Sequence, residues 1–239
     1  MSMTQDIVSF DPARPSVEVA RVRVDAGAVD AGVRAARAAF PAWSARSMDE
    51  RAALLQAWSA TCARHAERIA VAIMRETGKV LAEARQEAAL LSDKVAVTLE
   101  ERVRARVTGY EFPANATRVN RCTYRPFGVM AVIGPFNFPA HLPNGHWVPA
   151  LLAGNTVVFK PSEKAPGVGA LMAELMAEAA MPAGVFNLVQ GRGDAAAALV
   201  EHADVDGVLF TGSWPVGRRI MERNLDRPGR MVALEMGGS

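Results

Sequence analysis

GVMAVIGPF, residues 128–136, is an apolar, β-branched run bounded by glycine and proline. Four more runs of this kind follow along the chain: TVVFKPS (156–162), VFNLVQG (185–191), GVLFTGS (207–213) and MVALEMGG (231–238). Helical stretches separate them, at about 141–153, 166–180, 193–202 and 215–226. Short buried strands that alternate with helices are typical of a parallel sheet covered on both sides. The sequence therefore predicts an α/β fold: a Rossmann-like parallel sheet with helices on both faces.

The part of the chain before this array is mainly helical. Residues 1–24 favour short strands with a turn at DPARP (11–15), and apolar residues then recur at helical spacing to about Leu99. Pro41 is expected to interrupt the first helix. Ser47–Glu50 fits a capping box, and Gly78 supplies a stop signal.

A strand-like alternation between about Arg104 and Pro126 predicts a two-stranded excursion. We therefore divide the chain into an N-terminal helical part (1–105), a β-hairpin (106–125) and a Rossmann-like core (126–239).

Composition narrows the class of protein. The 239 residues carry 27 basic and 25 acidic side chains, a net charge of +2, which gives no reason to expect a nucleic acid or an anionic membrane as partner. The first residues lack the pattern of a secretory signal, and the most apolar run, 147–159, is too short and too broken to cross a bilayer. Cys62 and Cys122 have no metal-ligand spacing and form no disulfide framework. We expect a cytoplasmic protein without a metal site.

The strand ends carry polar or conformationally special residues, whereas the strand interiors are apolar. In open parallel sheets, ligands bind beyond the carboxyl ends of the strands. Those ends read GPFNFP (134–139), KPSE (160–163), TGS (211–213) and EMGG (235–238). The contrast predicts a ligand site at this edge of the sheet.

Each of these residues has a functional and a plain interpretation. Lys160 and Glu163 suit the hydroxyls of a ribose, with the carboxylate disfavouring an extra 2′-phosphate, or they form a surface ion pair. Gly212 and Ser213, with Gly217, can approach a phosphate at a helix N-terminus, or Ser213 is an ordinary N-cap.

Asn137 and Glu235 are the candidates for chemistry. The Asn137 amide can donate to a substrate oxygen that becomes negative, or it can satisfy a turn. Glu235 can serve as a general base, and a plain surface glutamate explains it equally well.

Together these segments resemble the aldehyde dehydrogenase superfamily. PFNFP (135–139), GNTVVFKPSE (154–163), P-x-G-V-x-N-x-V-x-G (182–191), FTGS (210–213) and LEMGG (234–238) occur in the family's order and spacing, and RETGK (75–79) and AAFPAWS (38–44) match its helical part. The match covers nearly the whole chain.

The resemblance implies roles for the strand-end residues. Lys160 and Glu163 would contact the adenosine ribose of NAD, and Gly212 and Ser213 its pyrophosphate. Asn137 would hold the oxyanion, and Glu235 would be the general base. Further cofactor contacts are expected at Pro135, Phe136, Ser162, Gly217 and Gly237. The excursion resembles the family's oligomerisation hairpin, so the parent enzyme is expected to be a homo-oligomer that acts on a small aldehyde.

Within the superfamily, two segments resemble the succinylglutamate-semialdehyde dehydrogenases of the arginine succinyltransferase pathway. They are NRCTYRPFGVMAVIGPFNFP (120–139) and HLPNGHWVPALLAGNTVVFKPSEKAP (141–166). Arg125, Asn144 and His146 are candidate substrate contacts, although helix packing and capping explain them equally well.

The chain departs from the family pattern in one respect. The family's nucleophilic cysteine stands in a G-Q-x-C context after the LEMGG strand, whereas this sequence stops at Ser239. By motif neither Cys62 nor Cys122 is that nucleophile. We expect a truncated chain of an NAD-dependent aldehyde dehydrogenase that is inactive alone. The alternative is a non-catalytic NAD-binding or assembly module.

Overall fold

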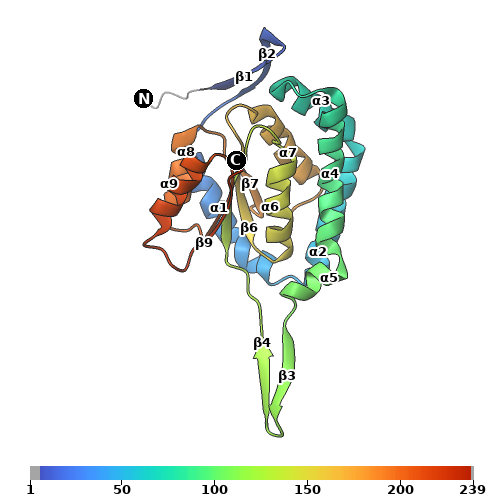
Figure 1. The fold of residues 1–239 in the computed structure, drawn as a ribbon, viewed down its shortest axis with the longest axis vertical. Helices are drawn as coiled ribbons and strands as arrows, with labels where there is room; N and C mark the ends of the chain where they lie inside the picture. Colours follow the sequence, from blue (N-terminus) through green and yellow to red (C-terminus); the bar gives the residue numbers. More distant parts are fainter. Residues whose placement is uncertain (1–5, 238–239) are drawn as a thin grey trace.

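The computed structural model describes residues 6–237, so Gly238 of the LEMGG motif lies outside the described part. Its centre is a five-stranded parallel sheet in the order β7-β6-β5-β8-β9 (Figure 1). In chain order the strands are β5 (Val129–Ile133), β6 (Thr156–Lys160), β7 (Phe186–Leu188), β8 (Gly207–Thr211) and β9 (Met231–Glu235). The predicted parallel sheet and its five strands are confirmed.

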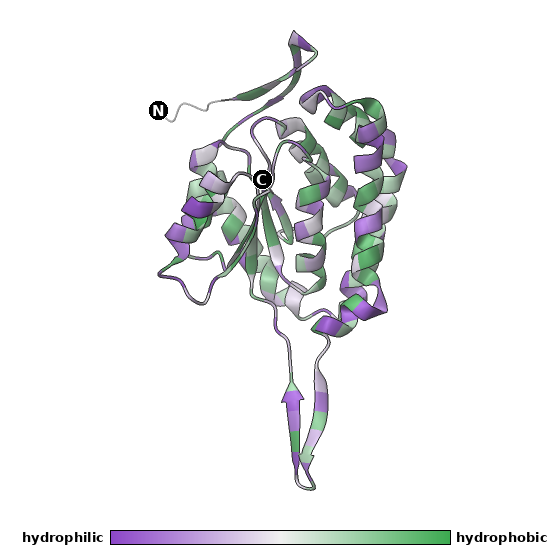
Figure 2. Ribbon diagram, in the orientation of Figure 1, coloured by the Kyte–Doolittle hydropathy of each residue, from purple (hydrophilic) through white to green (hydrophobic). Residues whose placement is uncertain are grey.

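Helices cover both faces of the sheet. One face carries α1 (Ala28–Ser44), α8 (Gly193–Glu201) and α9 (Trp214–Asn224), and the other carries α6 (His141–Leu152) and α7 (Pro166–Glu178) (Figure 1). Along β5, Met130 and Val132 pack with α6 and α7, whereas Val129, Ala131 and Ile133 pack with the helices of the opposite face. Both sides of each central strand are thus buried, which explains why these strands are continuous apolar runs (Figure 2).

A further helical layer packs outside α6 and α7. It consists of α2 (Met48–Arg64), α3 (Ala66–Thr77) and α4 (Leu81–Leu99), followed by the short α5 (Glu101–Arg104) and a 3-10 turn (Ala105–Val107). The capping box of Ser47 and Glu50 is present at the start of α2. Gly78 ends α3 with a left-handed φ of 73°, a conformation that costs glycine little.

Pro41 does not interrupt the first helix, contrary to the prediction. It lies inside α1, which continues to Ser44. Trp43, in the last turn, is buried in the core, and this burial offsets the hydrogen bond that proline cannot donate.

Two antiparallel hairpins lie outside the sheet. β1 (Ile7–Asp11) pairs with β2 (Arg14–Val22) near the N-terminus, and its Ser9 hydroxyl donates to the Glu76 carboxylate. β3 (Tyr110–Asn115) and β4 (Arg118–Cys122) form the second hairpin, which projects away from the rest of the molecule (Figure 1). Nearly all its side chains are exposed, so its stability within this chain rests on the ladder itself.

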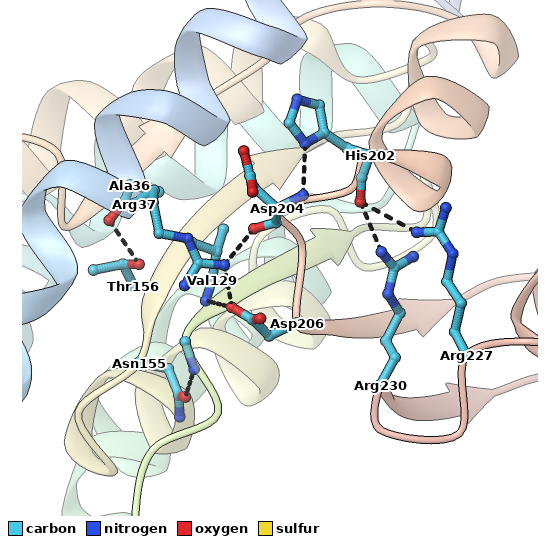
Figure 3. A network of polar contacts seen from close by, with 11 residues as sticks. Ala36, Arg37, Val129, Asn155, Thr156, His202, Asp204, Asp206, Arg227 and Arg230 are labelled. Carbon is cyan, nitrogen blue, oxygen red and sulfur yellow. Dashed lines mark hydrogen bonds and ion pairs between the residues drawn. The ribbon is translucent and has the colours of Figure 1, made fainter.

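A polar network fastens α1 to the amino ends of the strands (Figure 3). Arg37 donates to Asp204 O at 2.7 Å and to the Asp206 carboxylate at 2.5 Å. Asp206 also accepts from the Val129 N–H at 2.7 Å, so one carboxylate ties α1 to the start of β5. This network lies at the edge opposite to the strand carboxyl ends and supports the fold rather than a ligand site.

Within residues 6–237, no helix combines the length and apolarity needed to cross a bilayer. The same residues contain no cluster of three or more metal-ligating side chains.

Candidate functional site

The loops that follow neighbouring strands leave the sheet side by side. The pairing of β5 with β6, and of β8 with β9, extends to the carboxyl ends of the strands. It then continues one residue further, because Gly134 N–H donates to Lys160 O and Gly212 N–H donates to Glu235 O, both at 3.0 Å. The sheet therefore gathers the predicted residues of four strands at one edge.

Lys160 is a buried cation at this edge, with only 3% of its surface exposed. Its Nζ donates to Pro161 O at 2.5 Å and lies 3.9 Å from a carboxylate oxygen of the half-exposed Glu163. Burial lowers the pKa of Lys160, and the carboxylates of Glu163 and Asp194 oppose that shift. The structure thus places a buried donor beside a half-exposed acceptor, and the contact of this pair with a ribose stays a prediction.

The loops after β5 and β6 touch each other through an aromatic ring. Phe136 is half exposed, and the Lys164 ammonium lies 4.5 Å from the centre of its ring. Pro135 precedes it and is half-buried. Ser162 Oγ accepts from the Lys164 N–H at 3.3 Å, a local bond within the loop after β6.

Asn137 is exposed in the loop after β5. Its Oδ1 accepts from the Phe138 N–H at 3.1 Å, and its backbone carbonyl accepts from Lys79 Nζ at 2.8 Å. In the part of the chain that the structure describes, nothing accepts from the amide Nδ2. The local bond is the one expected of a turn asparagine, and it leaves the donor end of the amide available to a ligand.

A buried carboxylate fixes this loop from outside the sheet. Glu87 of α4 is fully buried and accepts from the N–H groups of Ala140 at 3.1 Å and His141 at 3.2 Å, at the start of α6. Its second oxygen accepts from Lys79 Nζ at 2.6 Å, and the same ammonium lies 3.6 Å from the centre of the Phe138 ring. Lys79 and Glu87 together clamp the loop that carries Asn137.

The loop after β8 opens α9. Ser213 is the N-cap residue, but its side chain accepts no bond from the helix, and only its carbonyl is used. Gly217 is buried, and a Cβ there would collide with Met236 and approach Phe210. Packing therefore accounts for this glycine, and its contact with a cofactor stays a prediction. Gly237 has a φ of +57°, which favours glycine in the turn after β9.

An apolar cleft of about 330 Å³ lies between α8 and α9, next to the end of β5. Its lining is aliphatic apart from two arginines: Ile133, Gly193, Ala196, Ala197, Val200, Val216, Arg219, Ile220 and Arg223. A cleft of this kind suits a flat apolar ring system.

Glu235 is exposed and lines a separate cavity of about 560 Å³. His146 and Arg125 line the same cavity, and His146 Nε2 lies 2.8 Å from Thr211 Oγ1. Burial lowers the pKa of His146, while the negative charge of Glu235 opposes this shift.

Asn144 belongs to the fold rather than to the cavity. It is buried, accepts from Trp58 Nε1 at 2.9 Å and donates to Leu91 O at 3.1 Å. Of the three candidate substrate contacts, the packing interpretation therefore accounts for Asn144, whereas His146 and Arg125 face the cavity.

The two cysteines lie away from Glu235. Cys62 is fully buried in the core among α2 and its neighbours, and burial strongly raises the pKa of its thiol. Cys122 ends β4 in the projecting hairpin. Both are free thiols, and neither lines the cavity of Glu235.

Sequence reasoning missed the clamp and the cleft between α8 and α9. The RETGK segment marked Lys79 as a family match, but nothing in the sequence linked it to Glu87. The small apolar residues of α8, in GDAAAALVE (193–201), were the available signal for the cleft.

With this geometry in view, the class of protein is clear. Residues 1–239 match the aldehyde dehydrogenase family, and the chain belongs to that family. The chain is 50% identical over 214 residues to the N-succinylglutamate 5-semialdehyde dehydrogenase of Paraburkholderia xenovorans. The matched residues cover 88% of this chain and 43% of that protein.

Solved structures give the same result. The chain resembles an NAD-dependent aldehyde dehydrogenase from Sinorhizobium meliloti with a TM-score of 0.92 and 32% identity, over 98% of this chain and 47% of the other. It resembles an NADP-dependent glyceraldehyde-3-phosphate dehydrogenase from Bacillus halodurans, complexed with NADP, with a TM-score of 0.90 and 32% identity, over 98% and 50%. This chain thus spans about half the length of the proteins it matches.

Proposed function

We propose that this chain holds NAD at the carboxyl edge of its sheet and contributes Asn137 and Glu235 to the oxidation of an aldehyde to a carboxylic acid. One observation carries the proposal: the buried Lys160 ammonium and the Glu163 carboxylate lie at the same edge as the apolar cleft between α8 and α9. Membership of the aldehyde dehydrogenase family supports the class of reaction.

The residues at this edge fit a dinucleotide. Lys160 and Glu163 offer a donor and an acceptor for ribose hydroxyls, and the cleft suits an adenine ring. Gly212 and Ser213 stand at the N-terminus of α9, which favours the pyrophosphate. The negative charge of Glu163 would repel a 2′-phosphate, so we propose NAD rather than NADP. The remaining proposed contacts are Pro135, Phe136, Ser162, Gly217 and Gly237.

NAD accepts a hydride from the substrate in this chemistry. Asn137 would donate to the substrate oxygen as it becomes negative, from a loop that Lys79 and Glu87 hold in place. Glu235 would take a proton from the attacking thiol or from the water that releases the acid.

A thiolate nucleophile completes this mechanism, and neither cysteine of the 239 residues fits that role. Cys62 is enclosed in the core, and Cys122 lies in the projecting hairpin. For the 239-residue chain by itself we therefore propose dinucleotide binding without turnover, which combines the two hypotheses drawn from the sequence.

We further propose N-succinyl-L-glutamate 5-semialdehyde, an intermediate of arginine catabolism, as the aldehyde of the whole enzyme. The 50% identity to a relative of that name supports this choice. The projecting hairpin, β3 and β4, supports a homo-oligomer, because an exposed ribbon of this kind is suited to pairing with another chain.

Trp214 offers a direct test of NAD binding. It is the first residue of α9, next to Ser213, and it is 56% exposed, whereas Trp43, Trp58 and Trp147 are buried. Titration of the 239-residue chain with NAD should change its fluorescence, with weaker binding of NADP.

Lys160→Met should weaken NAD binding by about tenfold, the loss expected for one hydrogen bond to a charged group. Arg34→Met, on the exposed side of α1, is the control and should bind NAD as the wild type does. No NADH should form when an aldehyde is added. Turnover at enzyme-like rates would contradict our interpretation of the cysteines, and a wild-type chain that does not bind NAD would contradict the proposal itself.

A further inference from the structure

The helix α7 follows the proposed ribose loop, residues 160–165, and it begins without a side-chain cap of its own. Its N-cap residue is Ala165, whose side chain accepts no bond from the helix. Pro166, the first helical residue, has no N–H to satisfy. The N–H groups of the first turn that need an acceptor are therefore those of Gly167 and Val168.

Glu76, near the end of α3, supplies this acceptor from another layer of the fold. One carboxylate oxygen accepts from the Gly167 N–H at 3.0 Å, and the other accepts from the Val168 N–H at 2.6 Å. These are the second and third helical positions, whose N–H groups an N-cap side chain satisfies in other helices. Only 5% of Glu76 is exposed, so a buried group of the outer helical layer fixes the start of α7.

The first turn of α7 is in direct contact with the ribose loop. A Cβ at Gly169 would lie 2.4 Å from Pro161 Cγ, so Pro161 packs against the backbone of α7 at this glycine. The carbonyl of Pro161 in turn accepts from Lys160 Nζ at 2.5 Å. A shift of the first turn of α7 would therefore move the group that holds the Lys160 ammonium.

Bonds within the ribose loop are local. The Ala165 N–H donates to Ser162 O at 3.0 Å, which shapes the loop but does not fix where it lies. Its far end is held where α7 begins, by Glu76 and by Gln190, whose Nε2 donates to Pro166 O at 2.9 Å. The position of the loop thus depends on side chains that lie outside it.

We infer that Glu76 is a positioning residue for the cofactor: it fixes the first turn of α7 and thereby places Lys160 and Glu163 for the ribose. Lys79, three residues further along the chain, holds the loop after β5. The corner between α3 and α4 would then position one loop of the cofactor site and one loop of the chemical site. This inference rests on the proposed function, and it adds to that function a residue that would not touch NAD.

Titration of the 239-residue chain with NAD, followed by Trp214 fluorescence, tests the inference. Glu76→Ala should weaken NAD binding about tenfold, because Lys160 and Glu163 must then be ordered during binding. Glu76→Gln keeps an oxygen that can accept from one of the two N–H groups, so it should weaken binding only about threefold.

Two variants separate positioning from a general loss of stability. Ser9→Ala removes the third hydrogen bond to the Glu76 carboxylate, on the side of the N-terminal hairpin, and should keep NAD affinity within about twofold of the wild type. Ile73→Ala removes a fully buried side chain one turn earlier in α3. It should lower the urea midpoint without changing NAD affinity under conditions where the chain is folded.

Hydrogen exchange gives a second measurement, made without NAD. The amides of residues 162–165 should exchange faster in Glu76→Ala than in the wild type, and at the wild-type rate in Ser9→Ala and Ile73→Ala. If Glu76→Ala does not fold, Glu76→Gln is compared with the same two variants.

The outcomes separate the two proposals. Wild-type NAD affinity and exchange in both Glu76 variants, or an equal loss of affinity in Ile73→Ala, overturns the positioning role and leaves the proposed function intact. A wild-type chain that does not bind NAD overturns the proposed function, and the positioning role with it. Loss of affinity confined to the Glu76 variants, with faster exchange in the ribose loop, supports both.

Discussion

Replacing Glu87 with alanine should destabilise the fold by about 3–5 kcal/mol. The carboxylate is fully buried, and its removal strands the Lys79 ammonium, whose side chain is only 11% exposed. Loss of one partner of a buried ion pair carries a cost of that size. The N–H groups of Ala140 and His141 also lose their acceptor, and each orphaned donor costs about 1–3 kcal/mol. These losses overlap and do not add, so the expected total loss of stability stays at about 3–5 kcal/mol.

Glu87→Gln should cost less, about 1–3 kcal/mol, because the amide oxygen still accepts from a backbone N–H. Urea unfolding of the 239-residue chain, analysed by linear extrapolation, measures both values. Glu83→Ala is the matched control: it lies one turn earlier on the exposed side of α4, and it should change stability by no more than about 0.5 kcal/mol.

A double variant tests the mechanism of this loss. If Glu87→Gln destabilises mainly by leaving Lys79 uncompensated, Lys79→Met in the same chain should recover part of the stability. The reasoning is refuted if Glu87→Ala is as mild as Glu83→Ala. It is also refuted if the effects of Lys79→Met and Glu87→Gln simply add.

Three further expectations concern other sites. Cys122 should react quickly with a thiol reagent in the native chain and Cys62 only on unfolding, since burial raises the pKa of Cys62; equal rates would contradict the core position. Gly217→Ala should destabilise by about 1–3 kcal/mol through its collision with Met236, and an unchanged urea midpoint would exclude that packing. Burial also raises the pKa of Glu76, so the folded state retains a proton that the unfolded state has already lost. The stability of the wild type relative to Glu76→Gln should therefore fall as pH rises from the ordinary carboxyl range through the folded-state pKa, whereas parallel pH curves would contradict this.

The sheet was predictable because its signal is local and repeated. Each central strand is buried on both faces and thus reads as a continuous apolar run, and the runs end in charged residues such as Lys160 and Glu235. The capping box at Ser47 and the left-handed Gly78 were equally visible, because a cap is defined within four residues.

Contacts between segments that are distant in the sequence have no comparable local sequence pattern, so they could not be predicted. Glu87 is one acidic residue in a helix with several, and its partners at Ala140 and His141 are backbone atoms more than fifty residues away. The proline rule failed at Pro41 for the same reason, because the burial of Trp43 that sustains the last turn is a tertiary effect. At Gly217 the local motif suggested contact with a phosphate, and only the structure shows that the Met236 side chain packs against this glycine.

Two different parts of the fold therefore position the residues of the candidate site. Sheet pairing fixes where the chain leaves the strands, through bonds such as Gly134 to Lys160 and Gly212 to Glu235. It does not orient the loop of Asn137, which is held by Lys79 and Glu87 from the outer helical layer. Because Glu87 of α4 bonds directly to Ala140, His141 and Lys79, substitutions in α4 should disturb the loop of Asn137 more than substitutions in the projecting hairpin. The N-terminal helices are in this sense part of the site, although no strand end lies within them.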